Sequence, residues 1–106
     1  MAKFVLAYGT GTQAPPATEA EGQAVMEAWM GWFGTLGGAI IDMGNPFGAS
    51  KSVAVDGSVR DGNLSSLGGY SIVEATDIDA AASMAKGCPV LASGGTVDVY
   101  EAMEIG

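Results

Sequence analysis

The stretch GYSIVEATDIDAAASMAK, residues 69–86, decides the fold, because it predicts a strand that leads directly into a helix. Residues 69–75 are rich in aromatic and β-branched side chains, which favour extended structure. Thr76 and Asp77 follow, and their side-chain oxygens are typical helix caps. We therefore expect a helix over residues 78–86 that packs closely on a sheet through its small side chains.

The first half of the chain predicts the same order of elements. A short apolar run, Lys3–Tyr8, predicts a strand. Thr18 and Glu21 have the spacing of a capping box, in which the two side chains satisfy free backbone N–H groups at a helix start. The helix that follows should end at Gly37 and bury one apolar face, which two methionines widen. The residues of this face are Val25, Trp29, Trp32, Phe33 and Leu36, with Met26 and Met30 beside them.

A hairpin is predicted in the middle of the chain. Ser52–Val55 and Ser58–Arg60 flank the dipeptide Asp56-Gly57. This dipeptide is a strong signal for a two-residue turn in which both central positions have positive φ.

Strands are also expected at residues 39–43 and 96–103, so the elements form two βαβ halves in tandem. This order is typical of the ferredoxin-like, or split βαβ, fold. We expect one α+β domain over residues 1–106, with two helices on one face of an antiparallel sheet.

The second face of the predicted sheet is apolar as well. Val5 and Ala7 point away from Phe4, Leu6 and Tyr8 along the first strand, and the strand at residues 69–75 has apolar side chains on both of its sides. An antiparallel sheet that is covered on one face only would not need this. We therefore expect a homodimer in which this second face packs on its twin.

Composition and charge exclude several classes of protein. The 106 residues have a net charge of −8, with only four Lys and Arg, so the chain lacks the basic surface of nucleic-acid binders and of peripheral membrane proteins. A hydrophobic content of 48% argues against disorder. The apolar run near the N-terminus is too short for a signal peptide or a membrane span. We expect a cytoplasmic protein that binds neither nucleic acid nor membrane.

The lack of histidine excludes most metal and nucleophile sites. Zinc sites need clusters of His or Cys, and a cysteine nucleophile needs a base, normally His. The one cysteine, Cys88, follows a predicted helix C-terminus, where the helix dipole disfavours a thiolate. We expect Cys88 to be structural, and we expect neither a metal nor a cofactor.

Three stretches resemble the YCII-related proteins of the DGPF type. Residues 52–62 (SVAVDGSVRDG) are similar to the hairpin of that family, residues 67–75 to its next strand and residues 94–100 to its last strand. The helix that begins IDAA, residues 78–81, also fits. The resemblance covers residues 50–103 well and the first half of the chain more loosely.

The resemblance implies a dimeric α+β barrel, formed when two ferredoxin-like sheets pack face to face. Some relatives of this barrel are isomerases, lyases or dehydrochlorinases that act on small ring compounds, and others are fused to sigma factors, which suggests regulation. Two features depart from the family. Asn63 and Leu64 replace the Pro-Phe of the DGPF motif, and the histidine that pairs with an aspartate in the family's enzymes is absent.

Asp42 is the candidate catalytic residue. It lies in or beside an apolar strand, where a carboxylate has a raised pKa and can transfer protons. Alternatively, Asp42 accepts hydrogen bonds from the backbone of the loop that follows. Asn45 and Lys51 flank the same loop, and with Asp42 they could bind an anionic or hydroxylated small molecule. Their alternatives are a turn residue and a solvated surface amine.

Two tyrosines are further candidates for ligand binding. Tyr8 ends the first strand and Tyr70 begins the strand at residues 69–75, so both could line a pocket between sheet and helices. Trp29 and Trp32 could add a stacking wall, although aromatic residues at helical spacing also pack in cores.

These residues leave three functions open. The first is a small-molecule-binding domain, or an isomerase or lyase that works without histidine and uses Asp42 for proton transfer. The alternative is a non-catalytic regulatory or protein-interaction domain. The third is a stable dimer without a ligand.

Overall fold

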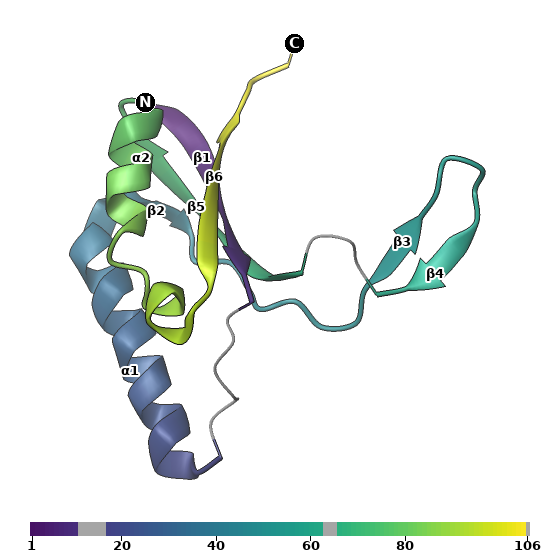
Figure 1. Ribbon diagram of the computed structural model, residues 1–106. Coiled ribbons are helices and arrows are strands. Elements are labelled where there is room, and N and C mark those ends of the chain that lie inside the picture. Colours follow the sequence, from purple (N-terminus) through teal and green to yellow (C-terminus); the bar gives the residue numbers. More distant parts are fainter. Residues whose placement is uncertain (11–16, 63–65, 106) are drawn as a thin grey trace.

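The computed structural model describes residues 1–10, 17–62 and 66–105 (Figure 1). The departure from the DGPF motif at Asn63 and Leu64 lies outside the described residues. In chain order the elements are β1 (Ala2–Gly9), α1 (Glu19–Leu36), β2 (Ile40–Asp42), β3 (Lys51–Val53), β4 (Val59–Asp61), β5 (Leu67–Ala75), α2 (Ile78–Ala85) and β6 (Thr96–Ala102). Short 3-10 turns at Gly37–Ala39 and Pro89–Ser93 follow the two helices.

One antiparallel sheet joins four of these strands in the order β2-β5-β1-β6. The two inner strands pair with Ala7 opposite Tyr70, and Asp98 of β6 lies opposite Ala7 on its other side. Both α1 and α2 lie on one side of this sheet (Figure 1). The predicted α+β fold, with a four-stranded antiparallel sheet and two helices, is therefore confirmed.

The hydrophobic core lies between the sheet and the helices. Phe4, Leu6 and Val73 are fully buried on the sheet. Trp32 reaches this layer from α1, and its Nε1 donates a hydrogen bond to the backbone oxygen of Met84 in α2 at 3.0 Å. Burying an apolar side chain of this size stabilises the fold by about 1.5–3 kcal/mol. The bond from Trp32 satisfies the one polar atom of its ring and links the two helices.

Helix α1 begins as the capping box predicts. Thr18 Oγ1 accepts a hydrogen bond from the backbone N–H of Glu21 at 3.1 Å. The Glu21 carboxylate accepts from the N–H of Ala17 at 2.8 Å, one residue before the usual partner in this motif. The two bonds satisfy backbone donors that would otherwise be free at the helix start.

The predicted buried face of α1 is correct only in the C-terminal half of the helix. Trp32 is buried and Trp29 is half-buried, but Val25, Met26 and Met30 are 46%, 67% and 56% exposed. The N-terminal half of α1 runs past the end of the sheet (Figure 1), so Val25 and Met26 have no layer to pack against. Met30 lies in the C-terminal half, and its exposure shows that the apolar face is narrower there than predicted. Among the described residues, no helix is long and apolar enough to cross a membrane.

The predicted hairpin is present, but its turn differs from the prediction. Val53 pairs with Val59, and the N–H of Gly57 donates to the oxygen of Ala54 at 2.9 Å. Gly57 has φ +87°, whereas Asp56 does not have positive φ. The loop therefore has three residues rather than two. It consists of a type I turn followed by a residue in the left-handed conformation, which is Gly57.

Gly44 is expected to be essential for the loop that follows β2. Its φ is +75°, and a Cβ there would collide with the backbone oxygen of Tyr70. Gly44→Ala should therefore lower the free energy of unfolding by at least about 2 kcal/mol. Urea denaturation followed by tryptophan fluorescence measures this. The control is Gly48→Ala, where the added Cβ meets open space. Equal stability of the two variants would contradict the prediction.

Candidate functional site

Tyr8 lies on the helix side of the sheet and is part of the core. Its hydroxyl donates to Ser71 Oγ at 2.7 Å, and Ser71 Oγ donates to the backbone oxygen of Met43 at 2.6 Å. The ring makes an edge contact with Trp29, with the ring centroids 5.0 Å apart. Burial raises the pKa of Tyr8 to about 12, so its hydroxyl stays protonated at neutral pH. The hydroxyl serves to satisfy Ser71, which is fully buried.

Tyr70 lies on the opposite side of the sheet. It pairs with Ala7, whereas Tyr8 pairs with Gly69 one position along. Because side chains alternate along a strand, Tyr8 and Tyr70 point to opposite faces. The expectation that both tyrosines line one pocket between sheet and helices is therefore wrong. Tyr70 instead stacks on Phe47, with the ring centroids 5.8 Å apart.

Asp42 ends β2, opposite Ile72 of β5. Its Oδ1 accepts a hydrogen bond from the N–H of Gly44 at 2.8 Å, which is the loop-capping role that was the alternative to catalysis. The residue is exposed, so the apolar surroundings that a proton-transfer role would require are not present in the single chain. Asn45 is also exposed, and its neighbour Pro46 bridges to Gly69 beside Tyr70. The structure thus brings Asp42, Asn45 and Tyr70 to one end of the sheet.

Lys51 does not join this group. It lies on β3 and forms an ion pair with Asp61 of β4, with Nζ 2.6 Å from the carboxylate oxygen. Both side chains are largely exposed, and the hairpin that carries them lies away from the main sheet (Figure 1). The joint anion site proposed for Asp42, Asn45 and Lys51 is not formed within one chain.

The side of the main sheet that faces away from the helices forms a surface that we call the open face. The pairing register arranges its side chains in three rows across the strands. The rows are Tyr100, Val5, Ile72 and Asp42; Asp98, Ala7 and Tyr70; and Ala102, Lys3 and Glu74. The centre of the open face is therefore apolar and partly aromatic, and carboxylates lie at both of its long edges.

Sequence reasoning missed Tyr100 as a member of this surface. It is 58% exposed and shares a row with Val5 and Ile72. The alternation of residues 96–102 was the available signal, but only the pairing register shows which face each residue joins. With Tyr100 and Tyr70 in neighbouring rows, the open face offers two aromatic side chains to a ligand or to another chain.

The charges of the open face decide which ligands it favours. Asp42 lies at the β2 edge and Asp98 at the β6 edge, while Glu74 lies beside Lys3. A surface bordered by carboxylates attracts cations and repels anions. Its apolar centre favours a small ring, and its edges favour a neutral or positively charged compound.

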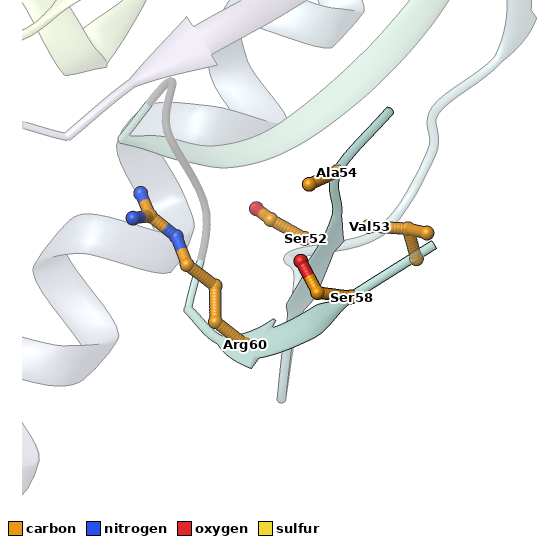
Figure 2. A pocket seen from close by; sticks show the side chains of 5 residues that line it. All are labelled: Ser52, Val53, Ala54, Ser58 and Arg60. Carbon is orange, nitrogen blue, oxygen red and sulfur yellow. The ribbon is translucent and has the colours of Figure 1, made fainter. Parts of the chain in front are cut away.

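A second candidate region is an open hollow of about 320 Å³ on the β3–β4 hairpin, which sequence reasoning did not identify. Figure 2 shows the side chains that line it, which are Ser52, Val53, Ala54, Ser58 and Arg60. Ser52 and Arg60 lie opposite each other in the hairpin, so a hydroxyl and a guanidinium face the same side. The Ser52 hydroxyl donates to the backbone oxygen of Gly62 at 3.1 Å, so the Arg60 guanidinium is the group here that can bind a carboxylate or another small anion.

Comparison with protein families identifies a family to which the chain is similar. A model of the YCII-related domain matches residues 6–105, which is nearly the whole chain. Comparison with curated proteins gives no match.

Cys88 is part of the hydrophobic core, and the pH dependence of stability tests whether its thiol is buried. The residue is 3% exposed, and burial raises the pKa of its thiol from 9.0 to about 11. A raised pKa in the folded state means that the stabilisation is complete below pH 9 and is lost as the pH rises toward 11. From pH 8 to pH 10, the free energy of unfolding should fall by about 1 kcal/mol more for the native protein than for Cys88→Ala. Urea denaturation of both proteins measures this, and parallel pH profiles would contradict it.

Proposed function

The chain belongs to the family of YCII-related domains, and on that premise we propose that it is a dimeric small-molecule-binding domain. Without the hairpin, the strand order β6-β1-β5-β2 has the first and third strands at the centre, as the ferredoxin-like fold requires. The observation that carries the proposal is the open face, which is apolar at its centre and which neither α1 nor α2 covers in the described part of the chain (Figure 1).

The amount of exposed surface supports a dimer. The chain exposes 7209 Å², whereas a compact monomer of this size exposes roughly 5,500 Å². A standard interface removes about 800 Å² from each partner. The excess of the observed surface over that of a compact monomer is therefore larger than the area that one standard interface would remove from each partner.

In the proposed dimer, two open faces pack against each other and enclose the ligand between the sheets. Tyr70, Ile72 and Val5 would form the walls, because they occupy the centre of the open face. The carboxylates at the edges would favour a neutral or cationic ring compound. The second oxygen of Asp42 can accept a hydrogen bond from a ligand hydroxyl or ammonium group.

Closure of the dimer would also change the surroundings of Asp42. Excluding water from the carboxylate beside Ile72 would give it the apolar surroundings that a proton-transfer role requires. An isomerase or lyase reaction carried by Asp42 is therefore an extension of the binding proposal. A non-catalytic interaction domain is the alternative. Binding of a small molecule would support the binding proposal, and its absence would favour the interaction domain.

The dimer is tested by placing a charge on the open face. Ile72→Glu should produce a monomer at micromolar concentration, because two carboxylates would meet in an apolar interface. Ile78→Glu is the matched control, since Ile78 begins α2 on the other side of the sheet, and it should remain dimeric. Sedimentation equilibrium measures both. A monomeric native protein, or a dimeric Ile72→Glu variant, would refute this interface.

Ligand preference is tested with three small ring compounds of different charge. Phenol and benzylamine should raise the melting temperature by about 5 °C when present at roughly ten times their dissociation constants, and benzoate should have little effect. Tyr70→Ala should abolish the shift, whereas Tyr8→Phe, on the helix side, should keep it. If a dimer forms and none of the compounds changes the melting temperature, the interaction-domain alternative is favoured.

A further inference from the structure

The β3–β4 hairpin, residues 51–61, is an arm that extends from the body of the chain on the side away from the helices (Figure 1). Its strands form a two-stranded sheet of their own. The Cα radius of gyration of 15.3 Å exceeds the roughly 13 Å of a compact domain of this length. A two-stranded hairpin is marginally stable in water when nothing packs on it. The arm is therefore a segment for which a contact outside its own chain is expected.

The two faces of the arm differ in how far their side chains are already paired within the hairpin. On one face Val53 pairs with Val59, and Lys51 pairs with Asp61 at 2.6 Å. Cross-strand pairs of β-branched residues and of opposite charges each contribute roughly 0.2–1 kcal/mol to hairpin stability. The side-chain pairs on this face stiffen the arm, and the ion pair neutralises the charge of Lys51.

Four of the five residues that line the hollow described above lie on the other face of the arm, and Val53 borders it as well (Figure 2). Arg60 extends along it from β4, beside the hydroxyl-bearing residues Ser52 and Ser58. The Ser52 hydroxyl donates to the backbone oxygen of Gly62, and the Ser58 side chain hydrogen-bonds to Asp56. Arg60 is therefore the group that can bind a carboxylate here, through charge-assisted hydrogen bonds. The chain has twelve Asp and Glu against four Lys and Arg, so carboxylates are plentiful on a second copy of the same chain.

Among the carboxylates of the open face, Asp98 is best placed to be the partner of Arg60. Asp42 already accepts a hydrogen bond from its own loop, and Glu74 lies beside Lys3. Asp98 is exposed at the β6 edge, and its row continues with Ala7 and Tyr70. An edge position leaves its carboxylate within reach of a chain that approaches from the side.

We infer that the arm clasps a second copy of this chain, with Arg60 in the hollow bound to Asp98 of that copy. The inference rests on the proposed dimer, because the arm extends on the side of the sheet where the second copy would lie. By two-fold symmetry each copy gives one arm and receives one. The clasp adds a polar, directional contact at the rim of an interface whose centre is apolar, and so it sets the register of the two copies.

The test is a charge reversal with a matched control. Arg60→Asp should raise the dimer dissociation constant about tenfold or more at low salt, because it replaces attraction with repulsion. Lys86→Asp changes the net charge equally, but Lys86 caps the end of α2 on the helix side, so its effect should stay within about threefold. The double variant Arg60→Asp with Asp98→Arg restores opposite charges and should dimerise as tightly as the native chain. Sedimentation equilibrium measures all four proteins.

The outcomes separate this inference from the proposed dimer. If Arg60→Asp weakens the dimer no more than Lys86→Asp does, while Ile72→Glu still gives a monomer, the clasp is refuted and the dimer stands. A monomeric native protein would overturn both. If Arg60→Asp weakens the dimer but the double variant does not recover, Asp98 is not the partner and the inference fails. Hydrogen exchange of residues 51–61 gives an independent check, because a clasped arm exchanges more slowly as the protein concentration rises.

Discussion

The antiparallel pairing of β1 with β5 is the constraint on which the rest of this molecule depends. It places Leu6 opposite Ser71 on the helix side and Ala7 opposite Tyr70 on the other side. A shift of one residue would exchange the two sets of side chains and put the polar ones in the core. The hydrogen bond from Tyr8 to Ser71 and on to the backbone of Met43 holds this register, because without it a fully buried hydroxyl would lack a partner.

From this pairing come two surfaces with different physical roles. The helix side is filled by Phe4, Leu6, Val73 and the rings of α1, so it supplies stability. The open face has an apolar centre but ends in carboxylates at both edges, so it remains available for association and for ligand binding. The buried aromatic residues thus serve the core, and the proposed binding function belongs to the open face.

The hairpin forms a two-stranded sheet apart from the main sheet, and in the proposed dimer it would contact the second copy. Its valine and Lys51–Asp61 pairs keep it extended, and its other face presents Arg60 with two serines. In a chain with twelve Asp and Glu, the proposed clasp would use this guanidinium to recognise a carboxylate of the second copy. In the proposed dimer the apolar centre would supply affinity, and the charged rim would set the register of the two copies, as in many protein interfaces.

The sequence by itself determined the order of the elements, the α+β class and the capping of α1 by Thr18 and Glu21, because these depend on local patterns of residues. It could not show that Val25 and Met26 pass the end of the sheet, because helical periodicity does not reveal how far the partner layer extends. The type of turn at Gly57 could not be predicted without the strand pairing, because the pairing of β3 with β4 determines how many residues the loop contains. The alternation of side chains along each strand is clear from the sequence. Only the register between β1 and β5, however, shows that Tyr8 and Tyr70 lie on opposite faces of the sheet. The tertiary structure alone placed Lys51 on a separate hairpin, because that position depends on contacts between residues far apart in the chain.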